Sequence, residues 1–418
     1  MSANTALLED LRRRIQRLEE RLPDAPSASG ASGPRLPPAP PCTGERAAPL
    51  RLENLPGAVR EPGGALVVRA EVGPDVRLGG VAPADAFVAH PDVAAPLAGL
   101  PVPAPSGLLH GVRFLDIETT GLAGGTGTLA FVVGVARFEP SGQLVVEQMF
   151  LGAPAEEPVM LDRLAAALYG GTLLVTFNGR AFDVPLLRTR CVLSRRPPGL
   201  LGTLPHLDLL PIARRLWRGR SGDCRLVTLE ERVLGWRRLD DLPGWLAPAA
   251  YGEFLRTGDA ATVAGVVAHN RDDIVGMAAL LACALRTYEE PMIWAEDAAE
   301  FLAVGEHRLR LGDETGALPL LARALELTRS SEIRRRALTQ LARAHRRAGR
   351  IDAARQAWER YRSLFPGENQ GFVELAKLLE HRARDPVLAL EVASQAPHPG
   401  CGEVQRRIAR LKRRVGGA

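Results

Sequence analysis

Acidic residues stand at the ends of apolar segments in three separate parts of the chain. In the first, RFLDIETTGL, Asp116 and Glu118 lie two positions apart on an expected strand, so both side chains leave the same face of a sheet. Two like charges on a partly buried strand repel each other, and burying them is unfavourable unless a cation compensates. Mg²⁺ suits this place because it prefers carboxylate oxygens. A solvated strand end before a turn is the alternative interpretation of this pair.

The second and third segments each add an acid in a different structural context. In TLLVTFNGRAFDVPLL, Asn178 ends a second apolar strand and Asp183 stands where a helix begins. Asp is common at such a position as an N-cap, which is the alternative role for Asp183. In HNRDDIVGMAAL, Asp272 and Asp273 lie within a helical segment, where a solvated acidic face beside Arg271 is the alternative.

Taken in this order, the three segments resemble the three exonuclease motifs of the DEDD group in the ribonuclease H-like superfamily. The chain from about Leu108 to Leu285 also resembles the YprB-like ribonuclease H domain, a predicted nuclease family, in the stretches HGVRFLDIETTGLAGGTGTLAFVVGVARF, LPHLDLLPIARRLW and TLEERVLG. The resemblance implies a 3′→5′ exonuclease that acts on DNA or RNA with two Mg²⁺ or Mn²⁺ ions. It implies four metal-binding carboxylates, namely Asp116, Glu118, Asp183 and Asp273. It also implies that Thr119, Thr120, Gly121 and Leu122 lie beside the terminal nucleotide of the substrate, and that Asn178 lies near the backbone or Asp183.

The third motif departs from the family pattern at a histidine. In the DEDD group, the third motif has one of two patterns. Either a tyrosine precedes the last Asp with three residues between them, or a histidine precedes it with four residues between them. His269 has three residues between itself and Asp273, so a histidine stands at the tyrosine's place. We expect Asp273 to be the ligand, with His269 orienting or deprotonating a water, because its pKa is ordinarily near neutral. If Asp272 were the ligand instead, the distance of His269 from it would fit neither spacing. The remaining alternative for His269 is a structural role, in which it only caps the helix or packs.

Two neighbouring features are weighed against the same resemblance. Asp208, in PHLDLL, recurs in relatives of this domain and is a candidate to contact substrate or to support the ligands, although a solvated helix start is equally compatible. The glycine-rich GLAGGTGT has no lysine near it and is not a phosphate-binding P-loop, which disfavours triphosphate hydrolysis. We expect it to connect two strands tightly.

The elements around these motifs predict an α/β domain over residues 108–288. Three successive strands are followed by alternating helices and strands, which indicates a ribonuclease H-like mixed sheet flanked by helices. The expected strands cover residues 112–118, 128–139, 142–151 and 172–178, and the expected helices cover 157–170, 184–193, 207–218, 228–235 and 259–285. A β-rich lead-in is expected over residues 49–107, from runs such as GALVVRAEV and DAFVAHP.

The two ends of the chain have different patterns. An amphipathic helix is expected over residues 1–22, and a disordered Pro/Ala-rich linker over 23–48. In the C-terminal part, Ala317, Ala354 and Ala389 recur at separations of 37 and 35 residues, close to the tetratricopeptide period. We therefore expect an all-α domain of tetratricopeptide-like repeats over residues 295–415, with a protein partner as its ligand.

Composition limits the remaining choices. The 418 residues carry a net charge of +5, which is compatible with a nucleic-acid partner without establishing one. The five scattered cysteines argue against a zinc ribbon or a disulfide framework, and no apolar run reaches the length of a membrane span. We expect a cytoplasmic protein with no membrane partner. The alternatives to a nuclease are a catalytically weak nucleic-acid-binding protein and a scaffold in which the repeats dominate.

Overall fold

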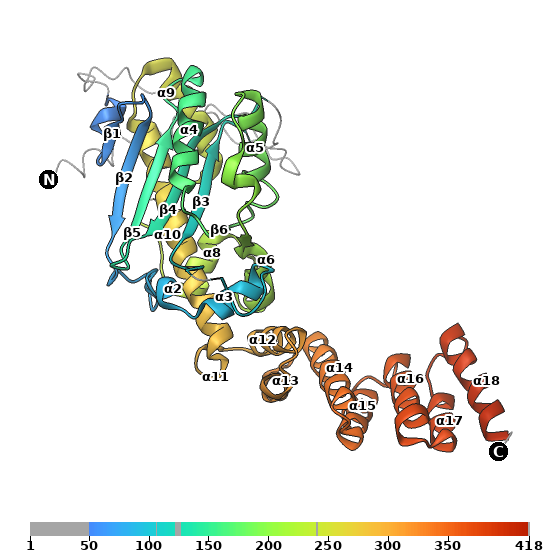
Figure 1. Ribbon diagram of the computed structural model, residues 1–418. Coiled ribbons are helices and arrows are strands. Elements are labelled where there is room, and N and C mark those ends of the chain that lie inside the picture. Colours follow the sequence, from blue (N-terminus) through green and yellow to red (C-terminus); the bar gives the residue numbers. More distant parts are fainter. Residues whose placement is uncertain (1–49, 106, 122–126, 240, 417–418) are drawn as a thin grey trace, which may run out of the picture. The chain divides into compact units, whose positions relative to one another are not determined.

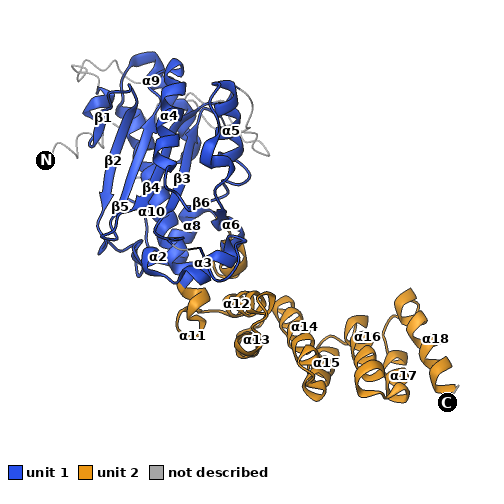
Figure 2. Cartoon of the chain, in the orientation of Figure 1, with its two compact units in different colours: residues 1–212, 225–285 blue, residues 213–224, 286–418 orange. Residues whose placement is uncertain are grey.

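The computed structural model describes residues 50–105, 107–121, 127–239 and 241–416. The helix expected over 1–22 and the linker expected over 23–48 lie outside these residues. The chain divides into two compact units (Figure 2). The first holds Met1–Ile212 and Arg225–Leu285, and the second holds Ala213–Cys224 and Arg286–Ala418.

A seven-stranded mixed sheet forms the centre of the first unit (Figure 1). Its spatial order is β1-β2-β5-β4-β3-β6-β7. The strands β3, β4 and β5 form an antiparallel meander, whereas β6 and β7 run parallel to β3. The strands span Ala58–Arg60, Leu66–Val72, Val112–Thr119, Ala130–Phe138, Leu144–Phe150, Leu173–Thr176 and His206–Asp208 in chain order. The predicted α/β fold with a mixed ribonuclease H-like sheet is confirmed.

The segment before the first acidic motif is part of the same sheet. Strand β2 pairs antiparallel with β5 along its whole length, and β1 pairs with β2 at the edge. The expectation that the run DAFVAHP is β-like is wrong, because Asp85–Val88 forms a short helix, α2. The Asp85 carboxylate accepts a hydrogen bond from the backbone N–H of Ala82, which supports a helical turn. A four-residue apolar run has too little periodicity to separate a helix from a strand.

Helices cover both faces of the sheet. Arg113 and Asp116, which face opposite sides of β3, contact different helices: Arg113 donates to the Ala167 carbonyl on α4, and Asp116 contacts α10. On the α10 side the ring of Tyr251 stacks on Phe131 at 4.3 Å and closes the core. The helices that lie wholly in the first unit are α2 Asp85–Val88, α3 Pro91–Leu97, α4 Glu157–Leu168, α5 Asp183–Leu193, α8 Leu226–Leu229 and α9 Ala247–Thr257, with a π-helical turn at Glu230–Leu234. The helices α6 Leu209–Leu216 and α10 Ala261–Glu289 each begin in the first unit and end in the second, and α7 Arg218–Ser221 belongs to the second unit.

The second unit is built mainly of antiparallel helices in succession. Ala317, Ala354 and Ala389 each lie fully buried on the second helix of a pair, as the repeat period predicts, because only a small side chain fits where paired helices pack closely. The helices are α11 Pro291–Trp294, α12 Ala298–Arg310, α13 Glu314–Leu327, α14 Ser331–Arg347, α15 Ile351–Leu364, α16 Asn369–Leu378, α17 Pro386–Ser394 and α18 Gly402–Gly416. The predicted C-terminal helical-repeat domain is confirmed. Among the described helices of the whole chain, none is both long enough and apolar enough to cross a membrane.

Candidate metal centre

Strand β3 carries the first two acids on the face of the sheet that α10 covers. Glu118 is buried, and Asp116 is partly buried two residues before it. Opposite Asp116 on β4 stands Gly134, where a Cβ atom would lie 2.3 Å from Oδ1 of Asn270 and 2.4 Å from Cδ1 of Ile274. The glycine therefore lets α10 approach the sheet closely at the level of the acids.

A buried amide network fixes the Asp116 carboxylate. The Nδ2 group of Asn270 donates to Oδ2 of Asp116 at 2.7 Å. Gln148 on β5 donates in turn to Oδ1 of Asn270 at 2.8 Å and to the Val267 carbonyl at 2.7 Å. Asn270 is fully buried and was not among the predicted site residues. Its place beside His269 in the motif was the signal that could have found it.

Asp183 brings the third carboxylate from the first residue of α5. Its side chain is buried, with 7% of the residue exposed. Burial raises the pKa of Asp183 to about 7, and the nearby charges of Asp208 and Asp273 add to this, while hydrogen bonds from its own backbone and that of Ile117 oppose it. No side-chain hydrogen bond of an N-cap is made at the start of α5. Phe182 is the N-cap of α5, and the influences of Ile117 and Asp273 show that the Asp183 carboxylate lies near β3 and α10.

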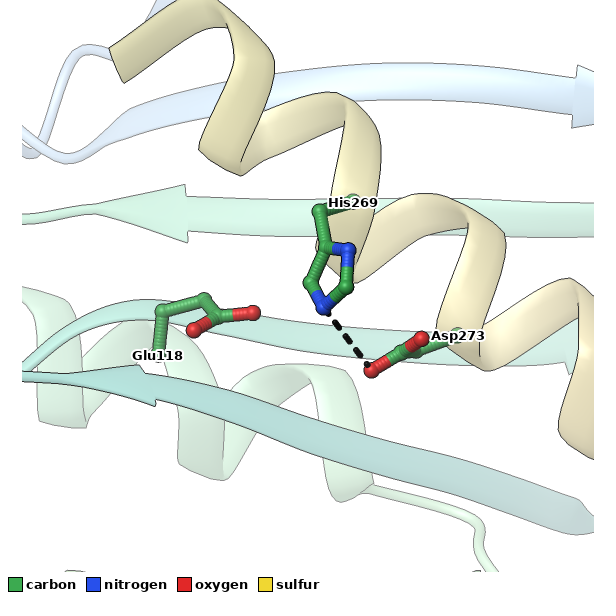
Figure 3. A group of neighbouring side chains, drawn as sticks. All are labelled: Glu118, His269 and Asp273. Carbon is green, nitrogen blue, oxygen red and sulfur yellow. Dashed lines mark ion pairs between the residues drawn. The ribbon is translucent and has the colours of Figure 1, made fainter. Parts of the chain in front are cut away.

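His269 and Asp273 lie one helical turn apart on α10 and point toward Glu118 (Figure 3). Nε2 of His269 is 3.7 Å from Oδ2 of Asp273. One ligand atom each of Glu118, His269 and Asp273 lies within 4.8 Å of the other two. Burial lowers the pKa of His269, but the hydrogen bond to Asp241 and the charges of Asp273 and Glu118 outweigh it and raise this pKa to about 9. In the metal-free protein the imidazole is therefore a cation among carboxylates.

The neighbouring Asp272 is turned away from this group. Its carboxylate accepts a hydrogen bond from Nε of Arg271 at 2.8 Å and forms an ion pair with the same guanidinium. Of the two adjacent aspartates, Asp273 is grouped with Glu118 and His269, whereas Asp272 pairs with Arg271.

A segment between α8 and α9 supplies charged partners that the sequence did not reveal. The Arg238 guanidinium, with 2% of its side chain exposed, donates two hydrogen bonds to Glu230 at 2.6 and 2.7 Å. It also donates to Oδ1 of Asp273 at 2.5 Å. Gly276 on α10 makes room for Glu230, because a Cβ atom there would lie 1.9 Å from its Oε1. The segment thus holds a fixed cation against one side of Asp273.

The same segment orients the histidine. Oδ1 of Asp241 lies 2.6 Å from Nδ1 of His269, so Nδ1 carries a proton and donates it to the carboxylate. A Cβ atom at Gly244 would lie 3.4 Å from Nε2 of His269, so the backbone passes close by on that side. Neither Asp241 nor Arg238 belongs to a recognisable motif, and no sequence signal pointed to them.

Asp208 supports the loop after β6. Its carboxylate accepts hydrogen bonds from the backbone N–H groups of Asn178 at 2.8 Å, Arg180 at 3.1 Å and Leu210 at 3.0 Å. Asn178 is exposed and adopts a φ of 65°, in the left-handed region. Asp208 therefore holds this exposed turn in shape at the end of β6.

The residues after Glu118 turn the chain out of β3. Oγ1 of Thr119 donates to the Gly121 carbonyl at 2.9 Å, and the Thr120 hydroxyl oxygen accepts from the Leu129 N–H at 3.0 Å. Gly121 ends the described part of this turn, and Leu122 lies outside the described residues. The tight connection expected of the glycine-rich segment thus lies mostly outside the described residues.

The donor set suits divalent cations. Burial, followed by the charges of Asp273, Asp183 and Glu118, raises the pKa of Asp116 well above its usual range. Burial also raises the pKa of Glu118 to about 8, although the nearby His269 opposes this. Acids crowded in this way are stabilised by a bound cation, and their oxygens are the ligands that Mg²⁺ and Mn²⁺ prefer. The four candidate ligands that would hold the ions are Asp116, Glu118, Asp183 and Asp273.

Comparison with known proteins defines the class. Residues 113–284 match the family model of the RNase_H superfamily, and residues 335–378 match a tetratricopeptide repeat model. The chain is 32% identical over 313 residues to "Uncharacterized protein YprB" of Bacillus subtilis (strain 168), with 72% of this chain and 74% of that protein covered. The chain thus belongs to the YprB family, and it carries a ribonuclease H superfamily domain followed by a tetratricopeptide repeat region.

Proposed function

We propose that this protein is a metal-dependent nuclease that removes nucleotides from the 3′ end of DNA or RNA. The observation that carries the proposal is the convergence of acids from β3, α5 and α10 on one place in a ribonuclease H superfamily domain. A buried cluster of like charges is unfavourable for stability, so its retention argues for a task that needs cations.

The chain's own residues have distinct tasks in this proposal. Two Mg²⁺ or Mn²⁺ ions bound by the four carboxylates would supply an activated water and offset charge on the phosphodiester in an in-line displacement. Asn270 keeps the Asp116 carboxylate in one orientation, and Arg238 does so for Asp273. Nε2 of His269 faces the same space, from which it can reach a water or an ion.

The turns beside the acids are proposed to bind the end of the substrate. Thr119, Thr120 and Gly121 follow Glu118 directly, and Asn178 lies in the exposed turn after β6, so these residues are proposed to contact the terminal nucleotide. Asp208 is proposed to act through that turn, because its carboxylate is occupied by three backbone N–H groups. The repeats are proposed to bind a protein partner in the cytoplasm.

The proposal is tested with single- and double-stranded DNA and RNA of one length, labelled at either the 3′ or the 5′ end. With Mg²⁺ or Mn²⁺ we expect the 3′ label to be released as mononucleotide and the 5′-labelled strands to shorten in single steps. A blocked 3′ end should protect the strand. Internal cuts would make the enzyme an endonuclease, and equal activity of the Asp116→Ala/Asp183→Ala double variant would assign the activity to a contaminant.

One observation favours a second candidate, a nucleic-acid-binding protein with little turnover. The Arg238 guanidinium already offers a fixed cation to Asp273. If this contact replaced an ion, binding of oligonucleotides would be sensitive to salt and independent of metal. Calorimetry with Mn²⁺ distinguishes the two candidates, because the nuclease binds the ion and the binding protein does not.

A further inference from the structure

We infer that His269 is itself a metal ligand, so that Glu118, His269 and Asp273 together hold one ion and select Mn²⁺ or a similar transition-metal ion over Mg²⁺. The inference rests on the proposed metal-dependent function. It names the ion that is preferred at one of the two proposed metal positions.

The three ligand atoms lie close to the separations that one ion requires. Nε2 of His269 and Oδ2 of Asp273 are 3.7 Å apart, and no pair among the three residues exceeds 4.8 Å. Ligand bonds of about 2.0–2.2 Å place two ligands of one ion up to about 4.3 Å apart. Small side-chain movements therefore suffice to close the group around an ion (Figure 3).

The second nitrogen of His269 is arranged as in histidine ligands. Nδ1 donates to Asp241 at 2.6 Å, which fixes the ring and leaves Nε2 without its proton when an ion binds. A carboxylate that accepts from the far nitrogen is the usual partner of a metal-binding histidine, since it fixes the tautomer and raises the basicity of the ligand. Asp241 is thus a positioning residue for His269.

Asp273 is restricted to one available oxygen. Its Oδ1 accepts from Arg238, which Glu230 anchors with two further hydrogen bonds, whereas its Oδ2 faces His269. Because Arg238 and Glu230 are both almost completely buried, this arrangement is part of the fold and not a passing surface contact. Asp273 should therefore contribute Oδ2 alone to the ion.

The mixed donor set determines which ions bind. Imidazole nitrogen is a good ligand for transition-metal ions, whereas Mg²⁺ favours oxygen ligands and gives up its waters reluctantly. The remaining acids, Asp116 and Asp183, offer oxygen ligands only. The ion position that they would form therefore suits Mg²⁺ and Mn²⁺ equally. The two ion positions of the site therefore differ in selectivity.

The test measures metal binding in the full chain, prepared without a histidine tag. In pulsed electron paramagnetic resonance, Mn²⁺ bound to the wild type should show coupling to one imidazole nitrogen, and His269→Tyr and His269→Asn should both lack it. By calorimetry the tighter Mn²⁺ affinity should fall at least about 10-fold in both variants and in Asp241→Asn, with Mg²⁺ affinity changed by less than about 3-fold. Asp272→Asn, the matched control on α10, should behave as the wild type.

Three results would overturn the inference. Bound Mn²⁺ without nitrogen coupling in the wild type, or unchanged affinity in both His269 variants, would assign His269 to the water or to a proton and leave the nuclease proposal standing. A wild type that binds neither ion would remove both proposals. Thermal unfolding of each variant without metal verifies that a lost signal does not reflect a lost fold.

Discussion

At Glu118 the needs of stability and of metal binding oppose each other. The carboxylate is buried on β3 and faces Asp273 and Asp183, and burial raises its pKa to about 8. A carboxyl group whose pKa is raised on folding stabilises the protein at low pH, and this contribution is lost as pH rises from about 4.5 to about 8. The metal-free protein thus carries an unfavourable charge at pH 8, which a bound cation offsets.

The first prediction follows from this conflict. At pH 8 in EDTA, Glu118→Gln should stabilise the protein by roughly 1–3 kcal/mol, because it removes a charge from an acidic cluster. Addition of Mn²⁺ should raise the melting temperature of the wild type and leave that of the variant nearly unchanged. Thermal unfolding with and without the ion measures both effects. A variant less stable than the wild type in EDTA would contradict the electrostatic account.

Arg238 is a buried cation that pairs with one of the candidate metal ligands, Asp273. It contacts Glu230 and Asp273, and both Arg238 and Glu230 are almost fully removed from solvent. Removing one partner of a buried ion pair leaves the charge of the other uncompensated. Arg238→Met should therefore destabilise the protein by about 3 kcal/mol or more. Arg238→Met combined with Glu230→Gln should recover about half of the loss. Chemical denaturation measures the two free energies of unfolding, and equal losses would show that the pair is not coupled.

At the scale of elements, the close approach of α10 to the sheet positions the third motif. Gly134 permits this approach, because a Cβ atom there would collide with Asn270 and Ile274. Gly134→Ala should therefore destabilise the fold by about 1–3 kcal/mol and weaken metal binding, since it displaces the helix that carries His269 and Asp273. Gly252→Ala on α9 is the matched control. Nothing lies within 4 Å of the added atom there, so this change should be neutral or stabilising by up to about 1 kcal/mol. Equal effects of the two substitutions would contradict this account of the packing.

The repeat unit contains a titratable core residue of its own. His307 on α12 is buried, with its ring 4.9 Å from that of Tyr288. Burial, and then the charges of Arg310, Arg215 and Arg308, lower its pKa to about 4. A histidine whose pKa is lowered on folding is neutral in the folded state, so stability is lost as pH falls from about 6.5 toward 4.

His307→Phe keeps an aromatic ring beside Tyr288 and removes this titration. The stability of the variant relative to the wild type should rise on acidification from pH 7 to pH 4, by about 2–3 kcal/mol in all. Denaturation curves at several pH values measure the difference. A constant difference across this range would show that His307 titrates in the folded protein as it does in the unfolded chain.

How far the sequence predicted these features depends on the type of element. The elements that carry Asp116, Asp183 and Asp273 were predictable, because each of these acids lies in or at the start of a segment whose apolar pattern predicts a strand or a helix. Arg238 and Asp241 were not, because they lie outside regular strands and reach the site only through the tertiary fold. The run DAFVAHP was assigned incorrectly because so short an apolar run has too little periodicity to distinguish a helix from a strand.

At the scale of the whole molecule, the chain joins a domain with a buried acidic site to a helical repeat array. Each part matches a family model of its own. Helical repeat arrays of the second kind offer extended surfaces on which proteins can bind. The proposed nuclease site lies in the first part alone, since the acids of β3, α5 and α10 all belong to it.

The proposed metal-dependent nuclease activity is tested most directly by the rate of 3′-end degradation as a function of Mn²⁺ concentration in the wild type, Asp183→Asn and Asp272→Asn. We predict a rate that saturates with Mn²⁺ in the wild type. Asp183→Asn should be slower by a factor of about 1,000 or more, and Asp272→Asn should remain within about 3-fold. No metal-dependent cleavage by the wild type, or equal rates for the wild type and Asp183→Asn, would contradict the account.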